Sequence, residues 1–207
     1  MTALPKTLLQ IAGAPLTPSP LDRSVLILID HQLEYVTGAI PLAGIEAAIA
    51  EAARLLDLAR KHHVPVFHIV HHGRPGAAAF DPQGPYAAIM PELLPIDGEE
   101  VVIKSLPSSF AGTNLHRLVQ ETGRKELIIA GFATHMCVST TTRAALDLGY
   151  RSTVVANATA SRDLPLFDGS GVIPAETVRQ TALAELADRF AIIVPDTAAL
   201  SSNGTGA

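Results

Sequence analysis

The stretch Ser24-Val-Leu-Ile-Leu-Ile29-Asp30 is a continuous β-prone run that stops at an aspartate. A strand with one exposed face alternates apolar and polar residues, whereas a strand covered on both faces is apolar almost throughout. The run therefore predicts a buried strand of a parallel sheet, with a carboxylate placed directly after it.

Further strands and helices alternate on either side of the later motifs. Apolar runs predict strands over 64–70, 101–103, 126–130, 151–156 and 191–194, and helical spacing predicts helices over 42–62, 113–123, 137–148 and 174–189. The Gly- and Pro-rich stretch 73–98 predicts a long excursion with a short helix near 86–90. Alternating strands and helices indicate the α/β class. We expect a three-layer α/β/α Rossmann-like fold with a six-stranded, mostly parallel sheet.

The chain of 207 residues is long enough for one well-buried domain. Its Pro-rich, aperiodic start predicts an extended arm over residues 1–22, followed by one α/β domain over 23–197 and a flexible tail over 198–207.

Composition excludes several classes of protein. The net charge of −5 and the pI of about 5.9 are unlike those of nucleic-acid-binding proteins. The apolar runs are strand-sized and too short for a membrane span, and the N-terminus does not resemble a signal peptide. We therefore expect a cytoplasmic protein without nucleic-acid or membrane partners. The single cysteine excludes an internal disulfide and a cysteine-based zinc cluster.

Three chemically active side chains follow three of the predicted strands. Asp30 ends the first, Lys104 ends the third, and Cys137 lies in the turn that follows the fourth and begins a helix. Ligands in open parallel sheets bind outside the carboxyl ends of the strands. A thiol at a helix N-terminus beside a lysine favours the thiolate, and a neighbouring carboxylate can exchange the thiol proton with a leaving group or water.

Each of these residues also has a plain structural interpretation. An aspartate after a strand is often a turn or capping residue, a lysine there is usually solvated, and a lone cysteine near a helix start is more often a packing residue. Their joint appearance at one edge of the sheet favours a catalytic site.

Three segments resemble the isochorismatase-like cysteine hydrolases, a family that includes nicotinamidases and several amidohydrolases. They are Val25-Leu-Ile-Leu-Ile-Asp30-His-Gln32, the lysine segment from Lys104 to Leu115 with Phe110 and Thr113, and Gly131-Phe-Ala-Thr134-His-Met-Cys137-Val138. The similarity runs from about Ser24 to Val194. All three segments occur in the family's order.

The resemblance implies a catalytic triad of Cys137, Asp30 and Lys104. It also implies a cis peptide bond between Phe132 and Ala133, and an oxyanion hole formed by the backbone N–H groups of Ala133 and Cys137. Candidate substrate-binding residues at the same edge are Gln32, Phe110, Thr134 and His135, and His31 and His68 are further candidate neighbours of the pocket. The family commonly forms homo-oligomers, so we expect a dimer or tetramer acting on a small-molecule substrate.

The sequence departs from the nicotinamidase branch, whose members carry an Asp-x-His metal set after the second strand. Here that place holds His71-His72-Gly73, without an aspartate two residues before either histidine. We interpret His71 and His72 as polar strand-end residues, and we expect no metal and no cofactor.

The leading hypothesis is hydrolysis of a C–N bond in a small amide, ureide or lactam through a covalent Cys137 intermediate. One alternative is isochorismatase-type vinyl ether hydrolysis, which family members perform without a nucleophilic thiol. The other is a redox or binding protein that uses Cys137 without hydrolysis. No dinucleotide, Walker A or Gly-x-Ser-x-Gly motif is present.

Overall fold

The structure is a computed structural model and describes residues 4–201. Its core is a six-stranded sheet in the order β3-β2-β1-β4-β5-β8, in which every neighbouring pair is parallel. The strands are β1 (Ser24–Ile29), β2 (Val66–His71), β3 (Glu100–Lys104), β4 (Glu126–Phe132), β5 (Arg151–Ala160) and β8 (Ile192–Val194). The predicted three-layer fold is thus confirmed, and β1 lies at its centre between β2 and β4.

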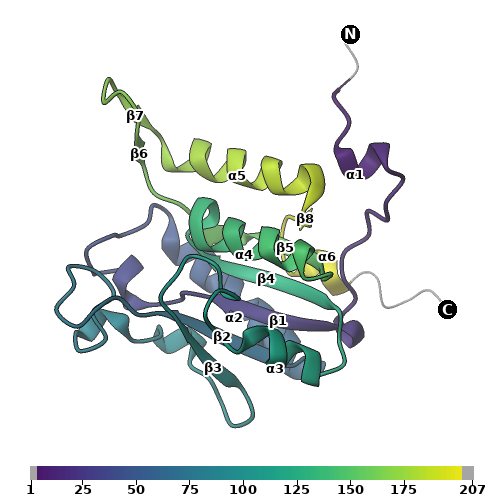
Figure 1. The fold of residues 1–207 in the computed structure, drawn as a ribbon, viewed down its shortest axis with the longest axis horizontal. Coiled ribbons are helices and arrows are strands. Elements are labelled where there is room, and N and C mark those ends of the chain that lie inside the picture. Colours follow the sequence, from purple (N-terminus) through teal and green to yellow (C-terminus); the bar gives the residue numbers. More distant parts are fainter. Residues whose placement is uncertain (1–3, 202–207) are drawn as a thin grey trace.

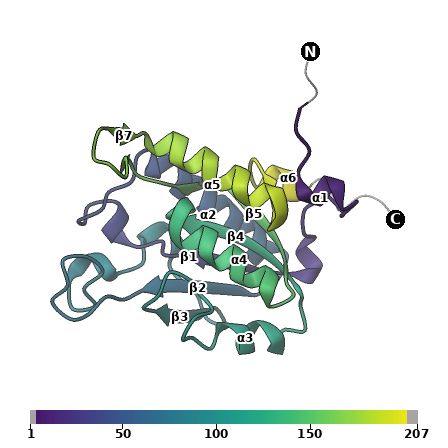
Figure 2. The same ribbon diagram turned by 45° about the horizontal axis from the view of Figure 1, so that its top comes forward.

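Helices cover both faces of the sheet (Figures 1 and 2). One face carries α2 (Ile45–Lys61) and α6 (Ala198–Ser201), and the other carries α3 (Leu115–Glu121), α4 (Ser139–Asp147) and α5 (Ala175–Arg189). Val25, Ile27 and Ile29 of β1 pack in the cluster with α3, α4 and α5, whereas Leu26 and Leu28 pack against α2. Side chains of a strand alternate between its faces, so this double covering requires the unbroken apolar run from Val25 to Ile29.

The N-terminal arm is more structured than the sequence predicts. It contains the helical turn α1 (Leu8–Ile11), which Thr7 and Gln10 close in a capping box, and the 3₁₀ turn η1 (Leu21–Arg23). The arm packs on its own domain, because the backbone N–H of Ser19 donates to Oγ1 of Thr153 at 2.7 Å. The capping signal in Thr7-x-x-Gln10 was present in the sequence, but the helix is only four residues long.

Three further segments differ from the prediction. A two-stranded antiparallel hairpin, β6 (Leu164–Pro165) and β7 (Val172–Ile173), extends from the molecule where only a loop was expected. At the C-terminus, α6 occupies the first part of the predicted flexible tail, and residues 202–207 lie outside the described residues. The excursion after β2 holds two 3₁₀ turns, η3 (Pro85–Ala87) and η4 (Pro91–Leu93), in place of one short helix.

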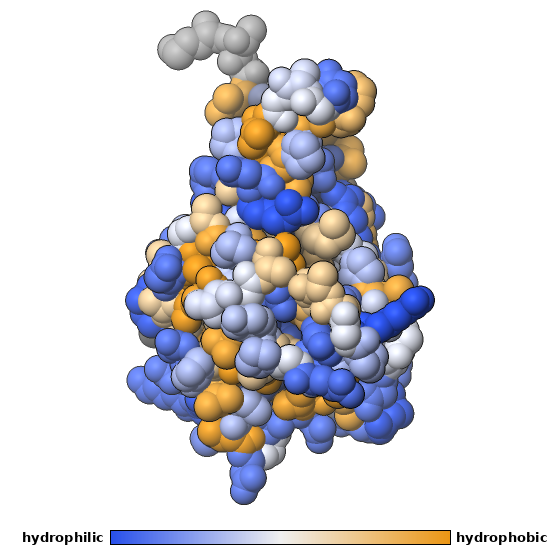
Figure 3. Space-filling model, turned by 90° about the vertical axis from the view of Figure 1, so that its left-hand side faces the viewer, coloured by the Kyte–Doolittle hydropathy of each residue, from blue (hydrophilic) through white to orange (hydrophobic). Residues whose placement is uncertain are grey.

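All six strands of the sheet run in one direction, so their carboxyl ends share one edge. This edge points to the left in Figure 1, toward the hairpin and the long loops, and Figure 3 views the molecule from that side. Apolar and polar residues are interspersed on this face (Figure 3). None of the helices within residues 4–201 has the length and apolarity that crossing a membrane requires.

Candidate active site

The carboxylate, the ammonium and the thiol that the sequence places at three strand ends meet at the carboxyl edge of the sheet. Nζ of Lys104 lies 2.8 Å from Oδ2 of Asp30 and donates a hydrogen bond to Sγ of Cys137 at 3.3 Å. All three side chains are buried, with 0% of Asp30, 1% of Lys104 and 5% of Cys137 exposed. The predicted convergence is therefore present, and the sulfur is the member of the group with the most exposure.

Neighbouring strands bring these groups together. Asp30 follows central β1, its backbone N–H bonds to the carbonyl of Ile69 on β2, and its φ of 55° lies in the left-handed region that few residues other than glycine adopt. Lys104 is the last residue of β3, two strands away, and its long side chain reaches across β2 to the carboxylate.

The turn after β4 carries the thiol. It begins with a cis peptide bond between Phe132 and Ala133, as the resemblance implied, and continues as a wide π-type turn, η5 (Thr134–Val138), before α4. Cys137 therefore lies within the first turn of a continuous helical segment and not at its first residue. The N–H groups of Ala133 and Cys137 border this turn, and their role in an oxyanion hole stays a prediction.

Gly131 is required by the close approach of β4 to β1. Its φ is 141°, and a Cβ atom built on it would lie 2.1 Å from the carbonyl oxygen of Ile29. Only glycine fits such a contact and such a backbone angle. Gly131 thus allows the chain to leave β4 directly beside the end of β1. The turn that carries Cys137 therefore begins next to Asp30.

Electrostatics favour a protonated thiol at rest. Burial raises the pKa of Cys137 to about 12, and the Asp30 charge adds to this effect, whereas Lys104 opposes it. Burial also raises the pKa of Asp30, against the lowering effect of the Lys104 charge and of hydrogen bonds from Lys104 and Cys137. The thiolate that the sequence favours is thus not the resting form, because loss of solvation and the Asp30 charge outweigh the Lys104 charge.

His71 belongs to this group of side chains, although the sequence suggested only a polar strand end. Its Nδ1 lies 3.1 Å from Nζ of Lys104, and the register of β2 and β3 pairs the two residues directly. The signal available in the sequence was that both residues end adjacent strands, but their pairing depends on the strand order.

Gln32 was expected to contact the substrate, and the structure gives it another role. Its side chain is fully buried. Its Oε1 accepts from the N–H of His71 at 2.8 Å, and its Nε2 donates to the carbonyl oxygens of His71 at 3.0 Å and Ala87 at 2.8 Å. Both N–H groups of the amide are thus committed to the backbone, so Gln32 braces the end of β2, and a contact with substrate stays a prediction.

The three other candidate substrate-binding residues lie around the nucleophile turn. Thr134 is buried and donates from Oγ1 to the carbonyl oxygen of Ala160 at 3.0 Å, which fixes the turn to β5. His135 is partly buried, and its Nδ1 lies 3.2 Å from Oγ of Ser161. Phe110 packs against the core cluster that contains Cys137. A role in binding substrate stays a prediction for all three.

The loop after β2 covers His71 with an aromatic side chain. The ring of Phe80 meets the imidazole edge-on with centroids 4.9 Å apart, and it also contacts Tyr35 at 5.3 Å. The buried carboxylate of Glu34 holds the loop, because its Oε2 accepts from the N–H of Phe80 at 2.8 Å.

Two further histidines lie on the opposite side of the sheet from the thiol. His31 is completely buried against Phe132, and neither of its ring nitrogens has a hydrogen-bond partner among residues 4–201. His68 is paired through Nε2 with Glu99 at 2.9 Å. In the part of the chain that the structure describes, no group of three or more His, Cys, Asp or Glu side chains is arranged to hold a metal ion.

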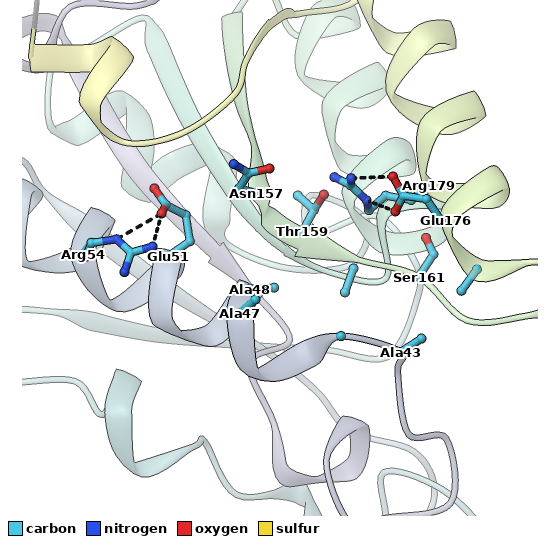
Figure 4. A pocket seen from close by; sticks show the side chains of 13 residues that line it. Ala43, Ala47, Ala48, Glu51, Arg54, Asn157, Thr159, Ser161, Glu176 and Arg179 are labelled. Atoms are coloured by element: carbon cyan, nitrogen blue, oxygen red, sulfur yellow. Dashed lines mark hydrogen bonds and ion pairs between the residues drawn. The ribbon is translucent and has the colours of Figure 1, made fainter.

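A separate cavity of about 450 Å³ lies between α2, the end of β5 and the start of α5 (Figure 4). Its lining includes Asn157, Thr159 and Ser161 but not Cys137. Its two arginines are neutralised within their own helices, Arg54 by Glu51 and Arg179 by Glu176. The charges of this cavity are therefore satisfied, and the reactive groups lie elsewhere.

Residues 24–198 match the model of the isochorismatase domain. A secreted isochorismatase effector of Verticillium dahliae is 38% identical over 182 residues, which are 88% of this chain and 93% of that protein. A maleamate amidohydrolase of Pseudomonas putida is 28% identical over 185 residues, covering 79% of this chain and 87% of that protein. Among solved structures, an isochorismatase from Pseudomonas putida is similar with a TM-score of 0.88 at 44% identity, covering 93% of this chain and 97% of that chain.

Proposed function

Because the chain belongs to the isochorismatase family, we propose that it is a hydrolase that cleaves a C–N bond of a small amide, ureide or lactam through a covalent Cys137 intermediate. The observation that carries this proposal is the contact of a thiol, a carboxylate and an ammonium in one buried group. The amidohydrolase among the relatives supports the class of bond.

In the first half of the reaction, Sγ of Cys137 attacks the carbonyl carbon while Asp30 takes the thiol proton. The hydrogen bond between the thiol and the Asp30 carboxylate provides the path for that proton. Negative charge then develops on the substrate oxygen, where the N–H groups of Ala133 and Cys137 would hold it. The carbon–nitrogen bond breaks as Asp30 returns the proton to the leaving nitrogen, which leaves a thioester on Cys137.

In the second half, water attacks the thioester and Asp30 takes a proton from it. The carbon–sulfur bond breaks, the acid is released, and the proton returns to the sulfur. Lys104 donates to both Asp30 and Cys137, so its charge compensates the negative charge on whichever of the two groups lacks the proton.

The burial of the sulfur supports a small substrate. With 5% of Cys137 exposed, a carbonyl group can approach the sulfur only if the molecule around it is compact. This argument favours a small molecule over a protein chain.

The test is a screen for ammonia or amine release across small amides, ureides and lactams, with Cys137→Ala as the blank. We expect turnover of at least one compound by the native protein, none by the variant, and an acyl adduct on Cys137 detected by intact mass. Turnover that survives in Cys137→Ala would overturn the proposed mechanism.

Vinyl ether hydrolysis is the second candidate, because the secreted relative and the related solved structure are both named isochorismatases. Hydrolysis of isochorismate by both the native protein and Cys137→Ala would favour it. A redox or binding role for Cys137 would instead leave every compound intact while the thiol still reacts with an oxidant. Since Cys137 is the only cysteine in the chain, such a protein would need a resolving thiol from outside.

A further inference from the structure

The environment of the Lys104 ammonium defines a role for a fourth residue. A lysine ammonium has three N–H donors and no acceptor. The structure offers it three acceptors, which are Oδ2 of Asp30 at 2.8 Å, Sγ of Cys137 at 3.3 Å and Nδ1 of His71 at 3.1 Å. The Lys104 side chain is 0% exposed, so water does not compete for these positions.

The tautomer of His71 follows from this contact. Because the ammonium can only donate, Nδ1 must be the acceptor, and Nε2 carries the proton of the neutral ring. Burial, with smaller contributions from Lys104 and His72, lowers the pKa of His71 from 6.5 to about 4. These are the titratable groups that act on the ring, since Phe80 on its other side is uncharged. His71 is therefore neutral near pH 7.

The structure also fixes His71 by means that a simple strand-end residue does not need. Gln32 pairs with both its backbone N–H and its carbonyl oxygen, and Phe80 packs on the ring. Phe80 is in turn held by the hydrogen bond to Glu34, with a φ of 55°. Three side chains thus keep Nδ1 aimed at the lysine.

We propose that His71 is a positioning residue: by accepting one N–H of Lys104, it directs the other two toward the carboxylate and the sulfur. Without this acceptor, the ammonium would keep one buried donor without a partner, which favours rotation of the Lys104 side chain toward another acceptor. Cys137 would then lose the contact with the positive charge that stabilises its thiolate form. The inference rests on the proposed function for its catalytic meaning, but the effect on the thiol is independent of any substrate.

Alkylation of Cys137 by iodoacetamide measures this effect directly. The thiolate is the reactive form, and the chain contains no other cysteine, so the rate of mass increase reports on one atom. The rate would be followed across pH in the native protein, in His71→Phe and His71→Leu, which lack the acceptor, and in His71→Asn, whose amide oxygen can occupy the place of Nδ1. His72→Leu provides the matched control, because it changes the adjacent histidine.

We expect His71→Phe and His71→Leu to alkylate about 10-fold to 100-fold more slowly near pH 7, the usual cost of misplacing a reacting group by about 1 Å. Their rates should stay below the native rate across the pH range of the assay. His71→Asn should recover most of the rate, and His72→Leu should match the native protein. Thermal unfolding of each variant shows which proteins are folded at the assay temperature, and the comparison is made among those.

Two outcomes would overturn the role of His71. In the first, His71→Phe or His71→Leu keeps the native alkylation rate and pH profile. In the second, His71→Asn is as impaired as the other two variants, which would indicate that the packing of the ring and not the acceptor matters. A failed substrate screen with an intact alkylation effect would reject the proposed hydrolysis and retain the positioning role, so the two failures are distinguishable.

Discussion

His31 should make the protein sensitive to acid, and this prediction can be worked out in full. The ring is buried, meets the Phe132 ring at a tilted angle with centroids 4.9 Å apart, and has no hydrogen-bond partner in the described part of the chain. Burial, with a smaller contribution from His68, lowers its pKa from 6.5 to about 3. The folded protein therefore holds the neutral ring in a range of pH where the unfolded chain binds a proton.

The sign follows from that difference. Below the unfolded pKa the unfolded chain takes up a proton that the folded chain refuses, so the free energy of unfolding falls as pH decreases from 6.5 toward 3. Each pH unit in this interval costs about 1.4 kcal/mol, and lowering the pH from about 7 to about 5 therefore costs about 2 kcal/mol. At pH 5 the folded ring is neutral whether its pKa is 3 or 4. The loss of about 2 kcal/mol therefore depends mainly on the pKa of this histidine in the unfolded chain.

The perturbation is His31→Leu, which keeps a side chain of similar volume but removes the titration. The free energy of unfolding is measured by urea denaturation near pH 7 and near pH 5 for both proteins. We expect the native protein to lose about 2 kcal/mol more than the variant over this interval. Every other titrating group is common to the two proteins and cancels. Equal losses in both proteins would refute the reasoning.

Three other predictions follow from packing and surface exposure. Gly131→Ala should abolish folded expression, because its Cβ would lie 2.1 Å from the Ile29 carbonyl oxygen; circular dichroism and soluble yield test this. Thr153→Val should lower the free energy of unfolding by about 1–3 kcal/mol, because it leaves the buried N–H of Ser19 without its acceptor. A variant whose free energy of unfolding in urea equals that of the native protein would contradict this prediction. The expected homo-oligomer should show in light scattering, and Phe167→Ser should lower its mass if the fully exposed Phe167 lies in the contact; a native protein that stays monomeric at high concentration would reject the assembly.

The six strands of the main sheet and their order along the chain were predictable, because each is an apolar run with a clear end. The positions of Asp30, Lys104 and Cys137 followed from those ends, since parallel strands bring their carboxyl termini to one edge. The extension of β5 to Ala160 was not predictable, because its last residues are Asn-Ala-Thr-Ala and carry no strand signal of their own. They are held by pairing with Gly131 and Phe132 across a register shift.

The roles of Gln32 and His71 depend on contacts that the sequence does not encode locally. Gln32 follows Asp30 by two residues, which suggested a ligand contact, and its amide bonds to the backbone of His71 and of Ala87. His71 meets Lys104 only because β2 and β3 are neighbours in register. Strand order and side-chain direction, rather than motif spacing, decide both cases.

The protonation state of the thiol shows which physical effect dominates at this site. A helix terminus contributes about 0.3–1 kcal/mol to a nearby charge. The rise in the pKa of Cys137 from 9.0 to about 12 corresponds to about 4 kcal/mol against the thiolate. Burial and the Asp30 charge together outweigh the Lys104 charge, so the protonated thiol is favoured near neutral pH. The proposed hydrolysis therefore needs a group that takes this proton as the sulfur attacks, and Asp30, in hydrogen-bond contact with Cys137, fits that role.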